Sequence, residues 1–177
     1  YLCCLTKAYG DTVMLCYGGG SIKKNGIYDE VTNILEAAGK TVVEFSGIMA
    51  NPTYAKVLEG AKLAKKNDVS LLLGIGGGSV MDCSKAISMA AVSEKDVWDE
   101  YWAKKGVVDF EPMPLGVIVT ASGTGSECNG GAVITNEEVM IKTDRDYPKC
   151  NPEFALMDPT YTYTVPTKQM VAGALIS

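Results

Sequence analysis

Apolar residues gather along the chain in short blocks that predict strands, each closed by a turn. Residues 12–17 (Thr-Val-Met-Leu-Cys-Tyr) form one such block, which ends at the Gly-Gly-Gly-Ser sequence of residues 18–21. Residues 41–45 and 69–75 predict two further strands, and the leucines of the second are typical of the middle of a parallel sheet. A fourth strand is expected over residues 115–120.

Segments with helical periodicity separate these strands. The spacing of apolar residues predicts helices over residues 28–38, 54–66 and 79–91, and Gly39 suits the C-terminal end of the first. Strands and helices in alternation predict the α/β class, with a Rossmann-like, doubly wound and mostly parallel sheet. A β-sandwich or a helix bundle does not fit this alternation.

The pattern changes after Gly131. Residues 132–135 (Ala-Val-Ile-Thr) and 139–142 (Val-Met-Ile-Lys) are mostly apolar and flank the Asn-Glu-Glu sequence of residues 136–138, which predicts a β-hairpin added to the sheet domain. Prolines then interrupt an extended stretch, and a new helix is expected to begin near Thr167.

Composition narrows the classes of function. The 177 residues are 47% hydrophobic, which is enough apolar material for a core, and no run approaches the roughly 18 residues of a membrane helix. The formal net charge of −5 argues against nucleic-acid and membrane partners, since phosphate backbones and anionic lipids attract basic faces. Six cysteines without a C-x-x-C pair predict reduced thiols and a cytoplasmic location. The absence of histidine excludes Ser-His-Asp, Cys-His and histidine-metal sites within this chain.

The Gly-Ile-Gly-Gly-Gly-Ser sequence of residues 74–79 is the strongest local signal of chemistry. It follows a predicted strand and opens a predicted helix, where free backbone N–H groups and the helix dipole can hold a phosphate. Ser79 and Asp82 have the spacing of a capping box at that helix. The dinucleotide fingerprint G-x-G-x-x-G is not present, so an ordinary tight turn before a capped helix remains the alternative.

A second glycine-rich turn, at residues 18–21, is expected to face the same crevice, because ligands of open α/β sheets bind outside the carboxyl ends of the strands. No acidic residue ends the preceding strand to bind a ribose 2′-hydroxyl. Ser21, Lys23 and Lys24 would instead tolerate a 2′-phosphate, although a solvated loop with two surface lysines is equally consistent. Residues 120–127, with four hydroxyls and two glycines, predict either a polar pocket wall or a surface connection.

Four stretches, at residues 17–26, 76–85, 123–127 and 157–162, occur in the order found in a known family. Together they resemble the iron-containing (group III) alcohol dehydrogenases, in particular the butanol dehydrogenase and broad-range aldehyde reductase branch. The resemblance implies that residues 1–165 form the NAD(P)-binding α/β domain. Residues 166–177 would begin the helical metal-binding domain of the family, the rest of which is missing from this sequence.

The resemblance also implies a set of cofactor contacts. Gly77, Gly78 and Ser79 would hold the pyrophosphate, and Asp82 would lie near the nicotinamide. The other matching positions are Gly19, Gly20 and Ser21 at the adenosine 2′ position, Thr120, Thr124, Asn129 and Lys142 on the far side of the crevice, and Tyr161 near the adenine or ribose. Family members that prefer NAD tend to carry Asp at the 2′ position, so NADP(H) is the expected cofactor, with NAD as the alternative.

The chemistry that the resemblance implies is reversible hydride transfer between the nicotinamide and the carbonyl carbon of a small aldehyde, the product being a primary alcohol such as butanol. Fe²⁺ or Zn²⁺ would act as a Lewis acid on the carbonyl oxygen. No protein base is obligatory in this scheme, and no catalytic residue is identified in the chain.

The metal site is where the chain departs from the family pattern. The family ligands are one Asp and three His, and Ile176 stands at the position expected for the Asp. This chain alone is therefore expected to bind no metal and to be inactive, within a parent enzyme that resemblance predicts to be a homodimer. The alternatives are a non-catalytic nucleotide-binding fragment and a protein of the glycerol dehydrogenase or dehydroquinate synthase type, which share this fold.

Overall fold

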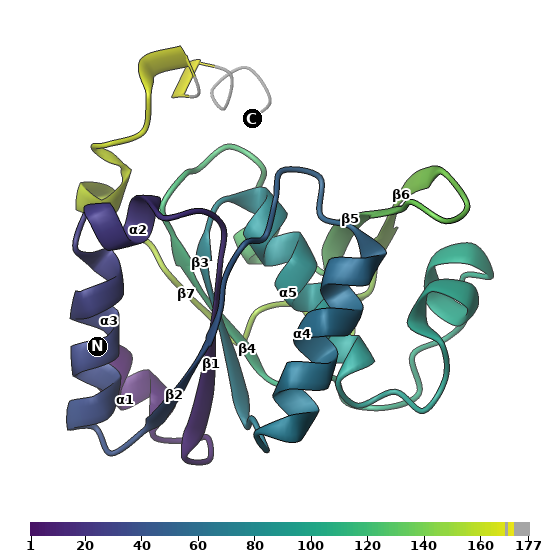
Figure 1. The fold of residues 1–177 in the computed structure, drawn as a ribbon, viewed down its shortest axis with the longest axis horizontal. Helices are drawn as coiled ribbons and strands as arrows, with labels where there is room; N and C mark the ends of the chain where they lie inside the picture. Colours follow the sequence, from purple (N-terminus) through teal and green to yellow (C-terminus); the bar gives the residue numbers. More distant parts are fainter. Residues whose placement is uncertain (169, 172–177) are drawn as a thin grey trace.

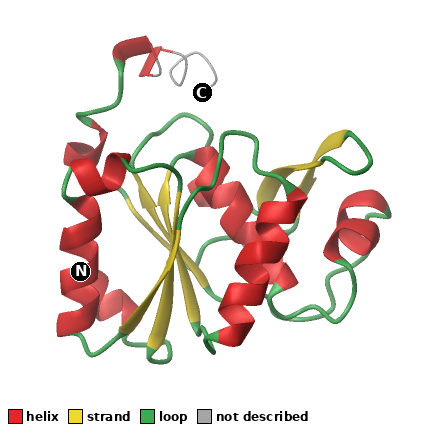
Figure 2. Cartoon of the chain, in the orientation of Figure 1, coloured by secondary structure: helices red, strands yellow, loops and turns green. Residues whose placement is uncertain are grey.

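A parallel sheet of five strands runs through the centre of the protein, with helices on both sides (Figure 1; Figure 2). The computed structural model describes residues 1–168 and 170–171. The strand order is β2-β1-β3-β4-β7, and every neighbouring pair is parallel. The strands are β1 (Thr12–Tyr17), β2 (Thr41–Phe45), β3 (Leu71–Gly76), β4 (Leu115–Val119) and β7 (Phe154–Leu156). The predicted class and sheet type are confirmed.

Alternation of side chains along each strand divides the apolar interior into two layers. Val13 and Leu15 of β1 face a layer completed by the helices α1 (Leu2–Thr6), α2 (Ser21–Lys24) and α3 (Ile27–Ala37). Met14 and Cys16 face the opposite layer, completed by α4 (Tyr54–Lys66), α5 (Gly78–Ala90) and the π-helix η1 (Trp98–Ala103). All four of these strand residues are 0% exposed, so β1 is covered on both faces.

A two-stranded antiparallel hairpin lies beside the main sheet. Its strands are β5 (Gly131–Asn136) and β6 (Ile141–Asp146), and Ala132 and Ile134 of β5 are buried in the core layer that includes α5. Three 3-10 turns complete the described elements: η2 (Ser126–Cys128), η3 (Pro148–Cys150) and η4 (Pro159–Thr162).

The topology brings the loops after β1, β2, β3 and β4 to one edge of the sheet, at the top in Figure 1. From β1, the chain first adds β2 on one side of the sheet. It then crosses back to add β3 on the other side of β1, and β4 and β7 continue in that second direction. The strand order therefore reverses between β1 and β3, which is where open α/β sheets bind ligands.

Most predicted elements have the predicted bounds to within two residues, and Gly39, with φ of 78°, follows the last turn of α3 as expected. The hairpin prediction was wrong in its second strand, because residues 137–140 form the turn and β6 begins at Ile141. The elements α1, α2, η1 and β7 were not predicted. The helix expected to begin near Thr167 falls largely on residues 169 and 172–177, which lie outside the described residues, as does Ile176.

Among the helices within residues 1–168 and 170–171, none has both the length and the apolarity that crossing a membrane requires.

Candidate functional site

The first backbone amides of α5 have no hydrogen-bond partner within the described residues. Gly77 precedes the helix in extended conformation, with φ of −100° and ψ of −166°, and it provides no side-chain cap. Its carbonyl oxygen accepts the amides of Val80 and Met81 at 3.1 and 3.2 Å. The amides of Gly78 and Ser79 make no hydrogen bond to another residue in the described part of the chain. Two free N–H groups thus stand at the positive end of a helix of 13 residues, an arrangement that binds anions.

The predicted capping box at this helix was wrong. The helix begins one residue earlier than expected, so Ser79 lies inside it, and no side chain caps it. Asp82 points away from the helix end: its carboxylate accepts the Ser126 hydroxyl at 2.8 Å and the Val133 amide at 3.1 Å. Burial raises the pKa of Asp82, against the opposing effect of these hydrogen bonds and of the charge on Lys85. The helix end is left open to a ligand as a result.

The loop after β4 lies directly over the glycine turn. The Thr120 amide donates to the Gly76 carbonyl at 3.0 Å, which joins the start of the loop to the end of β3. A Cβ on Gly78 would lie 2.8 Å from both Cγ2 and Oγ1 of Thr124, closer than real Cβ contacts. Gly78 is therefore required by the close approach of Thr124, and these two predicted residues are in contact.

In the other turn, Gly19 and Gly20 are not required by any close contact within the protein. A Cβ on Gly19 or Gly20 would meet no atom within 4 Å, and neither residue has a positive φ. Both are exposed at the carboxyl edge of the sheet, directly before α2. Neither backbone conformation nor packing within the described residues requires glycine here, so the turn leaves space that a ligand could occupy.

A groove of about 410 Å³ opens beside this turn. Ser21 from α2, Thr120 from the loop after β4 and Tyr161 from η4 all line it, so three predicted residues from distant parts of the sequence meet here. Burial, with a smaller contribution from Glu30, raises the pKa of Tyr161 to about 12. The phenol therefore stays protonated at neutral pH and can donate a hydrogen bond.

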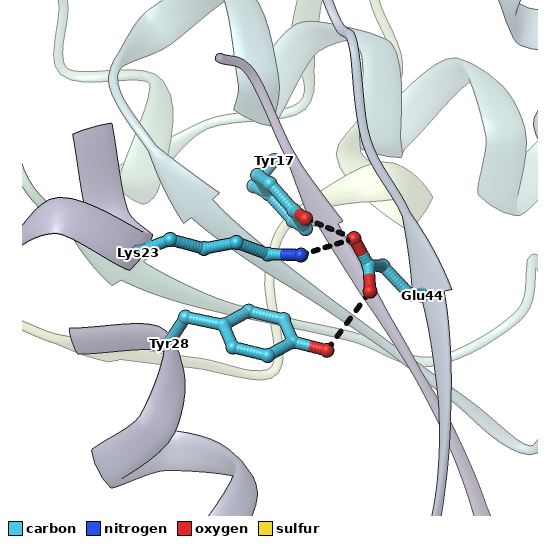
Figure 3. A network of polar contacts seen from close by, with 4 residues as sticks. All are labelled: Tyr17, Lys23, Tyr28 and Glu44. Atoms are coloured by element: carbon cyan, nitrogen blue, oxygen red, sulfur yellow. Dashed lines mark hydrogen bonds and ion pairs between the residues drawn. The ribbon is translucent and has the colours of Figure 1, made fainter. Parts of the chain in front are cut away.

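Glu44 on β2 organises a polar network next to the groove (Figure 3). Its carboxylate accepts hydrogen bonds from Lys23 Nζ at 2.7 Å, from the Tyr28 hydroxyl at 3.1 Å and from the Tyr17 hydroxyl. The Lys23 ammonium also lies 4.5 Å from the ring centre of Tyr28, a cation–π distance. Glu44 was missed in the sequence, where its signal was a single charged residue within an otherwise apolar strand.

The two lysines of α2 have different surroundings. Lys23 is paired with Glu44, whereas Lys24 lines the groove together with Ser21. Of the two lysines predicted to face a 2′-phosphate, Lys24 therefore lines the groove and Lys23 does not. The reason is the single turn of α2, which points adjacent side chains in different directions.

The hydrogen bonds to Glu44 predict a pH-dependent contribution to stability. The bonds from Lys23 and then Tyr17 lower the pKa of Glu44 from its ordinary 4.5 in the folded protein. The ionised carboxylate therefore stabilises the fold above that ordinary value, and this contribution is lost as the pH falls through the lowered pKa. We expect the difference in unfolding free energy between wild type and Glu44→Gln, measured in urea, to be larger at pH 7 than at about pH 3.5.

The matched control is Glu36→Gln on α3, since Glu36 is exposed and forms no ion pair within the described residues. Its effect on stability should be small at both pH values. Equal differences for Glu44→Gln at the two pH values would contradict the role of the network.

Asn129 and Lys142 lie apart from the groove. The Asn129 side chain accepts the Gly131 amide at 2.9 Å and donates to the Gly125 carbonyl at 3.0 Å, so it holds the loop in shape. Lys142 is exposed on β6 and its ammonium donates to Asn51 in the loop after β2. The structure thus gives both residues partners within the protein.

Lys85 is the residue of this region that sequence reasoning missed. It is 0% exposed, on α5, and its ammonium contacts the segment that contains Ser126 and Asn129. Its signal in the sequence was a lysine in the middle of a helix whose other residues are apolar or small, apart from Asp82.

A metal does not fit the described residues. Within residues 1–168 and 170–171, no group of three or more His, Cys, Asp or Glu side chains lies close enough to hold an ion. The whole sequence also contains no histidine.

The sequence and the fold of this chain are both similar to those of known dehydrogenases and reductases. The family model described as iron-containing alcohol dehydrogenase matches residues 2–159. NADH-dependent butanol dehydrogenase A of Clostridium acetobutylicum is 42% identical over 94% of this chain, and the NADPH-dependent aldehyde reductase YqhD of Escherichia coli is 38% identical over 92%. The crystal structure of NADH-dependent butanol dehydrogenase A from Thermotoga maritima covers 93% of the chain at 42% identity, with a TM-score of 0.87.

The chain is shorter than these proteins. It spans 42% of the length of the Clostridium and Escherichia relatives and 41% of the Thermotoga chain.

Proposed function

The chain belongs to the iron-containing alcohol dehydrogenase family, and from this premise we propose that residues 1–165 bind the nicotinamide cofactor of an alcohol dehydrogenase. The reaction would be hydride transfer between a small primary alcohol, such as butanol, and its aldehyde. The observation that carries the proposal is the uncapped N-terminus of α5, where Gly78 and Ser79 present free amides below Thr124.

The residues near the N-terminus of α5 would hold the pyrophosphate and the nicotinamide half of the dinucleotide. The free amides at Gly78 and Ser79, with Gly77 before them, would hold the pyrophosphate through charge-assisted hydrogen bonds. Thr120 and Thr124 would close over it from the loop after β4. Asp82 would lie toward the nicotinamide end, and Asn129 and Lys142 would support the far side of the site.

The adenosine half would occupy the groove beside α2. Gly19 and Gly20 leave room there, and Tyr161 offers a ring and a hydroxyl. Ser21 and Lys24 line the same groove, and no Asp or Glu of the described residues does so. A hydroxyl and one ammonium without a carboxylate favour a 2′-phosphate, so we propose NADP(H) as the preferred cofactor.

The role of the chain in the reaction is to bind and to orient. A bound nicotinamide supplies or accepts the hydride, and the protein sets its distance from the substrate. We propose that the metal ligands belong to the part of the relatives that this chain does not match, so that this chain alone is inactive. The parent enzyme is proposed to be a cytoplasmic homodimer, and the six cysteines, all unpaired, are consistent with a reducing compartment.

The proposed cofactor is tested by calorimetric titration of the chain with NADP⁺ and with NAD⁺. We expect micromolar-range binding of NADP⁺ and a preference of at least about 1.4 kcal/mol, or tenfold, over NAD⁺. Lys24→Met should reduce that preference, because Lys24 supplies the one ammonium among the described residues that line the groove.

Each other outcome has a distinct meaning. A preference for NAD⁺, in line with the names of the two butanol dehydrogenases, would refute the assignment of the 2′ position and keep the cofactor domain. Binding of neither nucleotide would refute cofactor binding by this chain.

A second candidate function is a nucleotide-binding module without catalysis, which the absence of histidine favours. Turnover by the full-length parent separates the two. Oxidation of butanol or reduction of butyraldehyde would support the dehydrogenase, preference for glycerol would favour the glycerol dehydrogenase type, and no turnover would support the module.

A further inference from the structure

Lys85 is a fully buried lysine whose hydrogen bonds all go to one segment. Its ammonium donates to the Ser126 hydroxyl at 2.8 Å, the Asn129 side-chain oxygen at 3.2 Å and the Gly131 carbonyl at 2.8 Å. An ammonium has three N–H donors, so these three acceptors satisfy it completely. All three lie in residues 126–131, between the loop after β4 and strand β5, 41 to 46 residues away in the sequence.

Asp82 supplies the opposite charge, one helical turn before Lys85 on α5. The Ser126 hydroxyl connects the two groups, because it accepts from Lys85 and donates to Asp82 at 2.8 Å. The second carboxylate oxygen of Asp82 accepts the Val133 amide at 3.1 Å. Burial lowers the pKa of Lys85, and the charge of Asp82 acts against that effect. A buried charge is costly unless it is hydrogen-bonded and has an opposite charge nearby, and Lys85 has three acceptors and is linked to Asp82 through Ser126.

The segment that Lys85 holds continues into the roof of the cofactor site. Thr124 Oγ1 accepts the Ser126 amide at 3.3 Å, and the Asn129 side chain donates to the Gly125 carbonyl at 3.0 Å. Thr124 in turn lies against Gly78 at the open end of α5. Ser122 and Thr124 are exposed, and within residues 121–130 only Ser126 and Gly130 are buried, so the middle of the loop depends on these bonds.

We infer that Lys85 is a positioning residue of the cofactor site, which fixes residues 120–131 over the free amides of α5 and so sets the space available to the pyrophosphate. The inference deepens the proposed function and rests on it in one respect, the identity of the ligand. Lys85 itself reaches no ligand, because it acts through Ser126, Asn129 and Gly131.

Hydrogen exchange on the ligand-free chain tests the positioning without any cofactor. In Lys85→Met, the amides of residues 120–131 should exchange at least about tenfold faster than in wild type, while those of β1 and β3 are unchanged. The matched control is Lys66→Met, at the exposed C-terminal end of α4, which should leave residues 120–131 unchanged. Unchanged exchange in Lys85→Met would overturn the inference.

Nucleotide binding tests the consequence for the site. We expect Lys85→Met to bind NADPH and NADH at least about tenfold more weakly than wild type, the effect of losing one hydrogen bond to a charged group. Adenosine 2′-monophosphate lacks the pyrophosphate and the nicotinamide. The affinity of Lys85→Met for this ligand should therefore lie within about twofold of the wild-type affinity, the size of effect expected of a neutral surface substitution. A loss of affinity for all three ligands would show a general structural role and would overturn the inference, as would no loss for any.

A variant with a smaller change covers the case in which Lys85→Met does not fold. Ser126→Ala removes one acceptor of Lys85 and the connection to Asp82, while it leaves both charged side chains and the other two acceptors of Lys85 in place. It should show the same pattern in exchange and in binding, with smaller effects. Failure of the wild type to bind any nucleotide would refute the proposed function, whereas the exchange result would still decide the positioning role.

Discussion

Gly78→Asp is expected to abolish nucleotide binding, with affinity for both NADP⁺ and NAD⁺ at least about 100-fold below wild type. Two effects act together at this position. A Cβ would lie 2.8 Å from two atoms of Thr124, so the loop after β4 must move. The new carboxylate would also stand beside the amides proposed to hold the pyrophosphate, and two unit charges about 4 Å apart near a protein surface repel by about 4 kcal/mol. Titration calorimetry with each nucleotide measures the result.

Two variants separate these effects. Gly78→Asn introduces a side chain of the same size without the charge, so it should bind more tightly than Gly78→Asp and more weakly than wild type. In Gly78→Ala combined with Thr124→Ala, the two Thr124 atoms nearest the new Cβ are removed, and the steric part of the loss should be relieved. Circular dichroism confirms that each variant is folded. Equal binding by Gly78→Asp and wild type would refute the assignment of the pyrophosphate site.

Gly20→Asp is expected to reverse the cofactor preference. Gly20 is the N-cap of α2, with φ of −76° and ψ of 8°, and a Cβ there meets no atom within 4 Å. Asp is a favoured N-cap residue, so the fold should tolerate the substitution. At the proposed 2′ position its carboxylate would repel a 2′-phosphate, lowering NADP⁺ affinity by about 100-fold. Affinity for NAD⁺, which has a 2′-hydroxyl there, should change by less than about threefold.

The matched control for this reversal is Gly20→Asn, an N-cap residue of the same size without charge. It should keep the wild-type preference. Equal losses of NADP⁺ and NAD⁺ affinity in Gly20→Asp, or no loss of either, would show that the 2′ end of the cofactor does not lie at this turn.

Local periodicity determined much of the fold. The predicted ranges of β1, β2 and α4 agree with the structure at both ends, because an apolar block closed by glycines or a helical stripe is a property of a few consecutive residues. The hairpin shows the limit of this reasoning. Val139, Met140 and Ile141 form an apolar run that predicted a strand, yet all three are about half exposed or more, and Met140 has a φ of 54° within the turn.

Elements that depend on distant partners were not predictable. The strand β7 has only three residues and is defined by its pairing with β4. Its partner residues in β4 lie far enough away that no short window of sequence contains the pair. The strand β6 is different: its polar sequence becomes a strand through its register with β5, the neighbouring arm of the same hairpin.

The sequence by itself determined the two glycine turns, the α/β sheet that places them at one edge and the absence of a histidine-metal site. Tertiary structure decided which side chains serve those turns. Glu44, 21 residues from Lys23, removes that lysine from the groove and leaves Lys24 there. Segment 126–131 gives Lys85 its partners and draws Asp82 away from the helix end, which stays uncapped. The physical reason is that a charge is satisfied by whatever group the fold brings within hydrogen-bond distance, and that group is a matter of topology rather than of local sequence.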